Sequence, residues 1–415
     1  MVKYATRQID LADSITDIQL DAEQSGIALT IRNGGRPIAF HLEATSPGAA
    51  LDSHYLKALV AKKAGRELIA DTLRREIRLR PIEEEAPSEE PSLTIAICTR
   101  HRSKLLKRCL RSIADLSPLP KDFEVVVVDN APQNDETEHV TRTFDTVRYV
   151  REPLAGLDFA RNRALAVSQK DYIAYVDDDT RLDPLWWKGL REAIQENPGV
   201  GAITGLVLPL VLDSEAQVLF EQRGGFRRGC EKLIYNGSNN PFNELYPCGA
   251  GIFGAGANMT LKRDCLLQIG GFDEALDTGA PLPGGGDLDI FYRMIRAGYP
   301  LAYEPLYLLY HEHRSDLRGL RRQYYTWGLG FMAFIKKSIA ADPVMKDRFR
   351  TLVYWWIRYA LKNILKDSIV KRSLPLSMSL AEFWGGIVGY CGEYSRSQKR
   401  VQKIRAAQGS VSTNP

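Results

Sequence analysis

The sequence of 415 residues lacks an uninterrupted run of 18 or more apolar residues, so it predicts no transmembrane helix. Its six cysteines lie far apart and form no Cys-x-x-Cys pair, which argues against a zinc ribbon or a disulfide framework. The first residues lack the apolar core of a signal peptide. The net charge is only +4, so overall charge gives no sign of nucleic-acid binding. We therefore expect a cytoplasmic protein without a nucleic-acid partner.

The composition divides the chain into three regions and one linker. Residues 1–80 hold short alternating segments and a charged helical stretch, which predict a small α+β module. Residues 81–91 are acidic and punctuated by proline, as is typical of linkers. Residues 92–316 alternate between strands and helices, and residues 317–415 form a basic region with amphipathic helical patterns. We expect these three regions to be separate domains.

The region 92–316 predicts an α/β fold with a mostly parallel central sheet. Strands are expected at 93–98, 124–129, 147–150 and 171–176, and helices at 104–116 and 157–167. The strand at 124–129 is apolar on both faces, which indicates a sheet covered by helices on each side. The pair Asp183-Pro184 predicts a further helix that reaches Glu196, with Asp183 as its N-cap.

Three consecutive carboxylates, Asp177, Asp178 and Asp179, follow the strand at 171–176. Such charges repel one another unless a cation neutralises them, and hard divalent cations prefer carboxylate oxygen. Ligands of open α/β sheets usually bind at the carboxyl ends of the strands. The triplet therefore predicts a Mg²⁺ or Mn²⁺ site that holds a phosphorylated substrate. The alternative is that the three residues cap a turn.

Six motifs resemble those of the GT-A-fold nucleotide-sugar transferases of glycosyltransferase family two, and they occur in the same order. They are Cys98-Thr99-Arg100, Asp129-Asn130, the segment 156–162 that leads to the Asp triplet, the segment 270–274, Gly286-Asp287-Leu288-Asp289 with Arg293, and His311-Glu312-His313-Arg314. The resemblance spans residues 92–325. It implies a Rossmann-like GT-A fold and a metal-dependent enzyme that transfers a sugar, with inversion, from a nucleotide-diphosphate sugar.

The resemblance also implies roles within the Asp triplet and its surroundings. Asp179 would ligate Mn²⁺ or Mg²⁺, and Asp177 would lie near the donor ribose. Asp178 would point to the opposite side of the strand and take no part. His311 or His313 would be a third metal ligand, and an imidazole nitrogen suits Mn²⁺ better than Mg²⁺. We favour His311 because it directly follows the apolar run 306–310.

Other residues are expected to bind the donor nucleotide. Thr99 and Arg100 end the first strand and Asp129 ends the second, where a nucleotide would sit. Turn chemistry is the alternative for Asp129. Arg161 would orient the Asp cluster or contact phosphate, although a helical arginine is more often solvated or ion-paired.

Asp287 is the candidate general base, since a carboxylate can take the proton of the attacking acceptor hydroxyl. Family members usually have Glu-Asp here, whereas this chain has Gly286-Asp287, which removes one carboxylate and leaves the base in place. The glycine-rich segment 279–286 is typical of a loop that closes over a donor, or of an ordinary surface loop.

The C-terminal region gives an indication of the acceptor that the enzyme uses. Its apolar stripe fits either a helix on an anionic membrane surface or a packed core helix; the stripe comprises Val353, Ile357, Ala360, Leu361, Ile364 and Ser368. From this region we expect a saccharide or lipid-linked saccharide acceptor, in cell-surface glycan assembly, and peripheral contact with the inner face of the plasma membrane.

Three other functions are alternatives to a transferase that adds one sugar. The segment 321–327 partly matches the Gln-x-x-Arg-Trp signature of processive polysaccharide synthases, but Thr326 stands in place of the arginine. We therefore expect addition of a single sugar. A nucleotidyltransferase remains an alternative, although the segment 99–103 lacks the expected glycine. A non-catalytic saccharide-binding protein also remains open.

Overall fold

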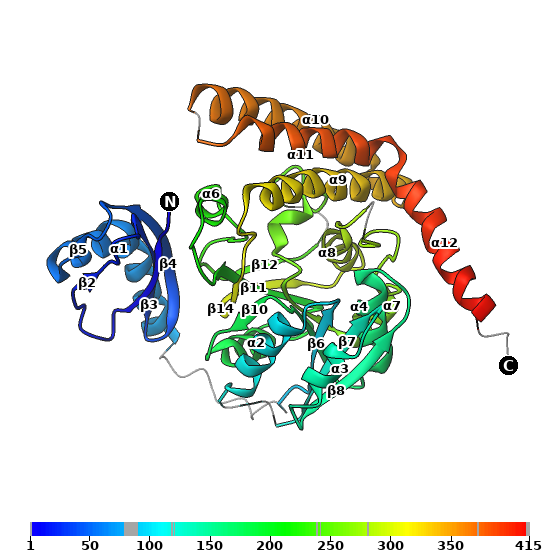
Figure 1. Cartoon of the computed structure of the whole chain (residues 1–415), viewed down its shortest axis with the longest axis horizontal. Helices are drawn as coiled ribbons and strands as arrows, with labels where there is room; N and C mark the ends of the chain where they lie inside the picture. The colour runs from blue at the N-terminus through cyan, green and yellow to red at the C-terminus, as the bar shows by residue number, and fades with distance from the viewer. Residues whose placement is uncertain are drawn as a thin grey trace.

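The computed structural model describes residues 2–411 except 79–89, 118, 120, 238–239, 241, 280–281 and 372. Its centre is a nine-stranded sheet (Figure 1). Eight strands follow the order β10-β14-β11-β13-β9-β6-β7-β8, and the ninth, β12, also pairs with β14. The strands are β6 (Leu93–Thr99), β7 (Phe123–Asn130), β8 (Val147–Glu152), β9 (Tyr172–Asp177), β10 (Thr180–Leu182), β11 (Ala202–Pro209), β12 (Leu233–Tyr235), β13 (Asn258–Lys262) and β14 (Leu301–His311). Most of the linker expected at 81–91 lies outside the described residues.

The sheet confirms the predicted α/β fold with a mostly parallel sheet. The neighbours β9, β6, β7 and β8 pair in parallel, as do β11 and β14. Two antiparallel pairings of β13, with β9 and β11, join these groups, so both groups point the same way. The valines of β7 at positions 125–128 are fully buried, as expected for a strand covered on both faces.

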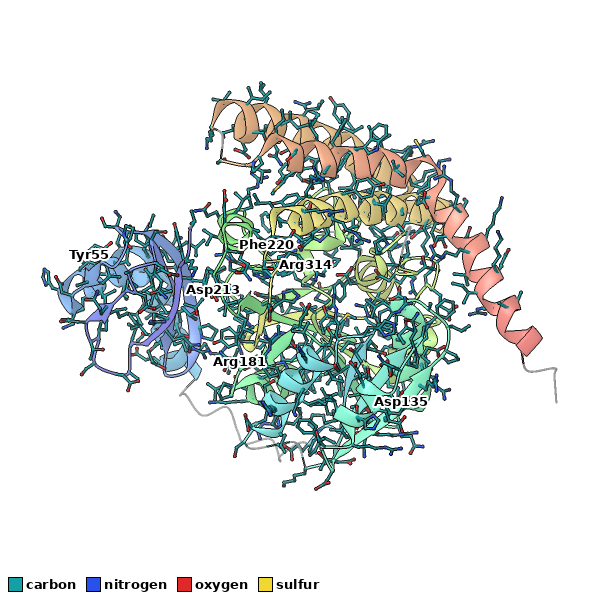
Figure 2. All side chains as sticks on the ribbon, in the orientation of Figure 1. Tyr55, Asp135, Arg181, Asp213, Phe220 and Arg314 are labelled. Carbon is teal, nitrogen blue, oxygen red and sulfur yellow. The ribbon has the colours of Figure 1, made fainter. Side chains whose placement is uncertain are left out.

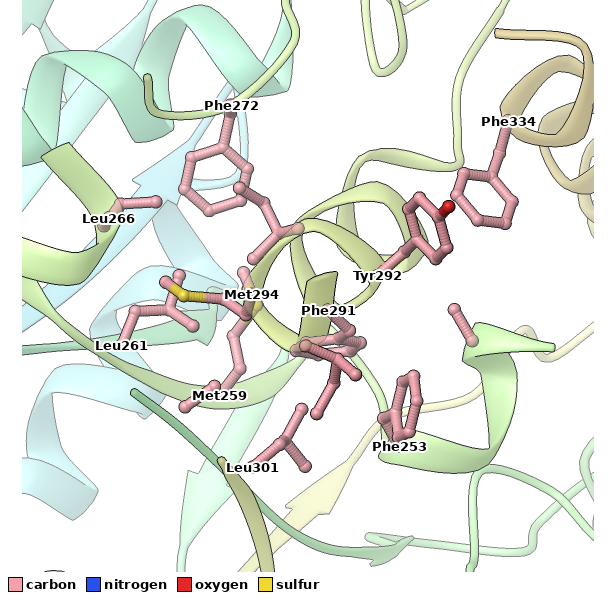
Figure 3. Close-up of a cluster of buried hydrophobic side chains, with 14 of the residues drawn as sticks. Phe253, Met259, Leu261, Leu266, Phe272, Phe291, Tyr292, Met294, Leu301 and Phe334 are labelled. Atoms are coloured by element: carbon pink, nitrogen blue, oxygen red, sulfur yellow. The ribbon is translucent and has the colours of Figure 1, made fainter. Parts of the chain in front are cut away.

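Helices cover both faces of the sheet. They are α2 (Ser103–Ala114), α3 (Glu136–Thr141), α4 (Leu157–Val167), α5 (Trp186–Glu196), α6 (Glu215–Gln222), the short 3₁₀ helix η1 (Ala250–Phe253), α7 (Arg263–Gln268) and α8 (Gly286–Arg296). Helix α8 lies at the centre of the larger apolar core (Figure 3). There Met294 lies beside Met259 and Leu261 of β13, and Tyr292 faces Phe334 of the next helix. This burial fixes where the first turn of α8 meets the sheet edge.

Helix α5 begins later than the sequence predicted. Its first residue is Trp186 and its N-cap is Leu185, whereas Asp183 was the expected N-cap. The Asp183 carboxylate accepts the Leu185 N–H at 3.0 Å and also pairs with Arg32 from the N-terminal region. The predicted cap was wrong because this carboxylate serves a long-range ion pair, which local sequence does not reveal.

The N-terminal region forms a compact unit beside the sheet (Figure 1). The strands β1 (Ala5–Asp10), β3 (Gly26–Asn33) and β4 (Arg36–Ala44) make a sheet that packs on α1 (Ser53–Arg78), and β2 (Ile18–Gln19) pairs with β5 (Ala50–Leu51). It joins the central body through Arg32, which bonds Asp183 and donates to the Tyr310 hydroxyl at 2.9 Å. In Figure 2, Arg181 and Asp213 are labelled on the side of the body that faces this unit.

The C-terminal helices stack on the other side of the body (Figure 1). They are α9 (Leu317–Ala341), η2 (Pro343–Met345), α10 (Lys346–Asn363), the π-helical η3 (Ile364–Val370), α11 (Leu376–Val388), η4 (Gly389–Glu393) and α12 (Tyr394–Val411). Glycines let α9 and α11 touch through their backbones: a Cβ on Gly385 would lie 2.0 Å from the Tyr325 carbonyl oxygen. Within the described part of the chain, no helix has the length and apolarity needed to cross a membrane.

Candidate active site

A cleft of about 980 Å³ opens where the parallel strands end. The ends of β6 and β9, the first turn of α8 and the end of β14 contribute its polar lining, and α9, α10 and α11 close its other side. Of the predicted site residues, the lining includes Thr99, Arg100, Arg161, Asp177, Asp179, Asp287 and His311. The structure therefore brings together side chains that are up to 212 residues apart in the sequence (from Thr99 to His311).

Asp177, Asp179 and His311 form a group that could hold a metal ion. One ligand atom from each lies within 4.8 Å of the others, and His311 Nε2 is 3.2 Å from Asp179 Oδ1. The pairing of β10 with β14 creates this group, because it sets His311 opposite Thr180, the residue after Asp179. Asp179 Oδ1 is buried without a hydrogen-bond partner among the described residues. A buried, unsatisfied carboxylate oxygen beside an imidazole fits Mn²⁺ or Mg²⁺.

Burial and neighbouring charges shift the pKa values of the groups in this site. Burial raises the pKa of Asp177, and the charge of Asp179 raises it further. Burial also raises the pKa of Asp178 to about 6, despite the nearby Arg102. For Asp179, burial is outweighed by His311 and Arg102, which hold its pKa well below the usual range. For His311, burial is likewise outweighed by Asp179, so its pKa is raised. Such mutual shifts are typical of a site built for a cation.

Asp178 has its own partners and lies outside the metal-site group. Its carboxylate accepts from the Thr99 hydroxyl at 2.6 Å and from Arg102 Nη1 at 3.0 Å. The same Arg102 nitrogen is 3.2 Å from Asp179 Oδ2. Sequence reasoning missed Arg102, although an arginine between a strand end and the next helix was a usable signal. Thr99 is thus tied to Asp178, and Arg102 brings a positive charge into the cleft.

Two of the predicted donor-binding residues, Arg100 and Asp129, differ in how far they are exposed to the cleft. Arg100 is exposed and lines the cleft. Asp129 is buried, burial raises its pKa, and it accepts from the Tyr149 hydroxyl at 3.0 Å. Its neighbour Asn130 reaches the lining instead, and its Oδ1 accepts the Gly156 N–H at 2.9 Å. Asp129 therefore lies one layer behind the surface of the cleft.

Arg161 is buried in an acidic cluster. Its Nη1 donates to Asp158 Oδ1 at 2.9 Å and lies 3.4 Å from Asp277 Oδ2. Burial raises the pKa of Asp277 to about 6. Asp277 also accepts the Gly286 N–H at 3.1 Å. Sequence reasoning gave no role to Asp158, although it lies in the motif segment 156–162, and it missed Asp277, which lies outside the motifs.

This cluster explains why glycine stands before Asp287. A Cβ on Gly286 would lie 2.2 Å from Asp158 Oδ2 and 2.6 Å from Asp277 Oδ2. Two carboxylates from other segments thus occupy the space beside position 286. The departure from the Glu-Asp pattern keeps acidic groups at this place but changes which residues supply them.

Asp287 lies half-buried in the first turn of α8. Its Oδ2 accepts the Gly256 N–H at 3.1 Å, and its Oδ1 accepts the Leu288 N–H at 2.9 Å. Backbone N–H groups at a helix N-terminus stabilise a negative charge. Asp289 and Arg293 form an ion pair one turn on, and Arg293 also donates to the Gly271 carbonyl at 2.6 Å. The candidate base therefore sits on a braced helix end.

The two histidines face different carboxylates. His311 is in the metal-site group, whereas His313 Nε2 lies 2.7 Å from Glu221 Oε1 of α6. Their Nδ1 atoms are 3.1 Å apart. Burial lowers the pKa of His313. This arrangement favours His311 as the ligand, and it leaves His313 as a neighbour behind it (Figure 2, where Phe220 and Arg314 mark this part of the body).

The C-terminal helices supply an aromatic wall that sequence reasoning did not place in the site. Trp327 of α9 and Trp355 and Tyr359 of α10 line the cleft and are exposed. The rings of Trp355 and Tyr359 stack with centroids 5.2 Å apart and an interplanar angle of 8°. Glu382 of α11 lines the same wall, and burial raises its pKa to about 6.

Comparisons with known proteins match the same part of the chain. The model of "Glycosyl transferase family 2" matches residues 94–217, and that of "Glycosyl transferase family group 2" matches residues 172–388. A glucosyl-dolichyl phosphate glucuronosyltransferase of Haloferax volcanii is 22% identical over 184 residues, which are 44% of this chain and 56% of that protein. A pre-mycofactocin glycosyltransferase of Mycobacterium tuberculosis is 25% identical over 56% of this chain and 46% of its own length.

Two further proteins are similar to this chain. The succinoglycan biosynthesis protein ExoM of Rhizobium meliloti is 25% identical over 58% of this chain and 74% of its own length. A solved mannosyltransferase of Pyrobaculum calidifontis, in complex with GDP-Man and Mn²⁺, is 18% identical, with a TM-score of 0.46 over 86% of this chain and 98% of that one. The chain spans about half the length of the first two relatives.

Proposed function

The chain belongs to glycosyl transferase family group 2, and from this premise we propose that it is a metal-dependent, inverting glycosyltransferase of glycan or glycolipid biosynthesis. The donor we propose is a nucleotide-diphosphate sugar, and the acceptor a saccharide or lipid-linked saccharide. The observation that carries this proposal is the single cleft that holds Asp177, Asp179, His311 and Asp287.

The proposed chemistry divides between the two ends of the cleft. A divalent cation held by Asp179 and His311, with Asp177 beside it, would neutralise the charge that develops on the leaving nucleoside diphosphate. At the other end, Asp287 takes the proton of the acceptor hydroxyl as that hydroxyl attacks the anomeric carbon. The bonds from Gly256 and Leu288 aim its carboxylate. One base and a direct attack give inversion of the anomeric centre.

For the donor nucleotide we propose two kinds of contact. Arg100 is exposed in the cleft and would meet the diphosphate or the base directly. Thr99, Asp129 and Arg161 are buried and already bonded, so they would act by holding the cleft in shape. For Arg161 this means keeping the acidic cluster beside Asp287 in place.

For the acceptor we propose the aromatic wall of α9 and α10. Exposed aromatic faces such as those of Trp355 and Tyr359 suit the apolar faces of sugar rings. Glu382 has no hydrogen bond or ion pair within the described residues, and it could accept a sugar hydroxyl. The wall is continuous with the lining that contains Asp287, so an acceptor held there would reach the base.

We also propose contact with the inner face of the plasma membrane. The outer side of η3 and α11 exposes large apolar side chains; Leu365, Val370 and Trp384 are 60%, 71% and 61% exposed. Ile357 and Leu361 of the expected stripe are exposed as well, while Ala360 is buried. Lys366 lies on η3, Lys362 lies near the end of α10, and Lys371 directly follows η3. Apolar residues flanked by lysine fit an anionic lipid surface.

The membrane proposal is tested with anionic vesicles. A variant with Leu365→Gln, Val370→Gln and Trp384→Gln should lose co-sedimentation that the wild type shows. Phe242→Gln, which changes a side chain that is 97% exposed elsewhere, should not. Equal sedimentation of the triple variant and the wild type would end this part of the proposal. Truncation near residue 345 is a poor test, because Phe349 and Trp356 of α10 belong to the main core.

The activity is tested with a panel of nucleotide sugars and Mn²⁺. The wild type should release a nucleoside diphosphate from one donor class, and Asp287→Asn should lower the rate by roughly 100-fold or more. Release of pyrophosphate would support a nucleotidyltransferase instead. Tight saccharide binding without nucleotide release from any donor would support a binding protein and contradict the proposal.

A further inference from the structure

His313 is a buried histidine with no role in the proposed reaction. It is 4% exposed and lies between His311 and Glu221, which is fully buried on α6. Glu221 Oε1 is 2.7 Å from His313 Nε2, and His313 Nδ1 is 3.1 Å from His311 Nδ1. At the end of this row, His311 Nε2 is 3.2 Å from Asp179 Oδ1. Four side chains from three segments thus form one continuous row of polar contacts.

The direction of each hydrogen bond in this row follows from the first acceptor. An ionised carboxylate only accepts, so His313 Nε2 must carry the hydrogen that faces Glu221. A neutral His313 then has a lone pair on Nδ1, and His311 Nδ1 must donate to it. The other nitrogen of His311, Nε2, is left with a lone pair that faces Asp179. That lone pair is what a metal ion requires of a histidine ligand.

The Glu221 carboxylate is held in place by a guanidinium group and by the loop after α6. Arg227 Nε is 3.0 Å from Glu221 Oε2, so a fixed positive charge faces the second carboxylate oxygen. A Cβ on Gly225 would lie 2.2 Å from the same carboxylate, so the loop after α6 closes tightly over it. The Glu221 carboxylate is therefore held against His313 and cannot turn away from it.

Aromatic rings pack against the two imidazoles. Phe220 meets His313 edge-on with centroids 4.7 Å apart, and Phe226 meets His311 at 5.1 Å. Gln217 donates to the main-chain carbonyl of His313 at 3.2 Å. Neither ring can rotate without displacing a packed neighbour, so the row of bonds persists.

We propose that Glu221 and His313 are positioning residues that set the tautomer of His311, so that its Nε2 is presented to the metal unprotonated. The inference rests on the proposed metal-dependent function. Partners behind a metal-binding histidine typically change metal affinity by about 10–100-fold. The helix α6 thereby acts on the metal site without touching it.

The direct test is the tautomer itself, measured by NMR on the full-length chain with ¹⁵N-labelled histidine and Mg²⁺. His311 should carry its hydrogen on Nδ1, and His313 should carry its hydrogen on Nε2. The variants His311→Asn and His313→Asn assign the two signals among the six histidines. A His311 ring protonated on Nε2 and bare on Nδ1 would overturn the inference.

The second test is Mn²⁺ affinity, measured from the electron paramagnetic resonance of free Mn²⁺. Glu221→Met removes the first acceptor and should weaken binding about 10–100-fold. Glu215→Met is the matched control, since Glu215 is an exposed residue of the same helix α6. Equal affinity of Glu221→Met and the wild type would refute the role of Glu221. If the wild type itself binds no Mn²⁺, the proposed metal dependence fails instead.

Discussion

Asp178 and Asp179 are adjacent residues in very different surroundings. Asp178 is enclosed by Thr99 and Arg102, and burial still raises its pKa to about 6. Asp179 faces His311, and its pKa is well below the usual range although burial acts against this. One carboxylate therefore serves the local structure, and the other is poised to bind a cation.

This difference predicts different defects in the two asparagine variants. Asp179→Asn should abolish most Mn²⁺ binding and lower glycosyl transfer by roughly 100-fold or more, because a charged ligand is lost. Asp178→Asn should keep Mn²⁺ binding, because Asp178 lies outside the metal-site group. Metal titration of both variants measures this. Equal loss of Mn²⁺ affinity in both would show that the two roles are wrongly divided.

At the scale of single residues, the sequence could predict those site residues that lie at strand ends or within the ordered motifs. Asp177, Asp179 and Asp287 follow or begin recognisable elements, and the structure brings them to one cleft. Arg102, Asp158 and Asp277 could not be predicted in the same way. Their importance depends on which distant carboxylate or guanidinium they meet, and that is set only when the sheet and helices pack.

At the scale of elements, hydrophobic patterns located the first strands of the sheet to within two residues. Such patterns show which side chains are buried, and within a buried strand the neighbouring residues already reveal this. The pairing of β10 with β14, which delivers His311 to Asp179, follows from the topology of the whole sheet and left no local signal. The same holds for the placement of α10 and α11 beside the cleft.

Helix α11 carries an element-scale prediction through Glu382. Burial raises the pKa of this carboxyl from 4.5 to about 6. A raised folded-state pKa contributes stability that is fully present below pH 4.5 and is lost as pH rises through about 6. Glu382→Gln cannot ionise, so above this window it should be more stable than the wild type by about 2 kcal/mol.

Urea unfolding across this pH window measures the effect. The two proteins should have similar stability near pH 4 and should diverge as the carboxyl ionises. Glu244→Gln, at an exposed position, is the control and should show no such divergence. A difference between Glu382→Gln and the wild type that does not change with pH would mean that this side chain is solvated in the folded protein.

At the scale of the whole molecule, the N-terminal unit is tied to the body that holds the site. We propose that residues 1–80 form a separate domain whose docking rests in part on a buried ion pair. Arg32 and Asp183 are 6% and 2% exposed, and the Tyr310 hydroxyl bonds to both. A second link runs toward the site, since Arg227, the partner of Glu221, lies over the ring of Phe40 with 4.5 Å to its centroid.

The buried pair predicts a non-additive response to substitution. Arg32→Met leaves Asp183 buried without its charged partner, which should cost about 3–5 kcal/mol of unfolding free energy. Adding Asp183→Asn should recover most of that loss, because the uncompensated charge is removed with it. Arg7→Met, at an exposed position of β1, is the matched control and should change stability little. Urea unfolding of the wild type, Arg32→Met, Asp183→Asn and the double variant measures the coupling. Additive losses would show that the two units do not depend on this pair for docking.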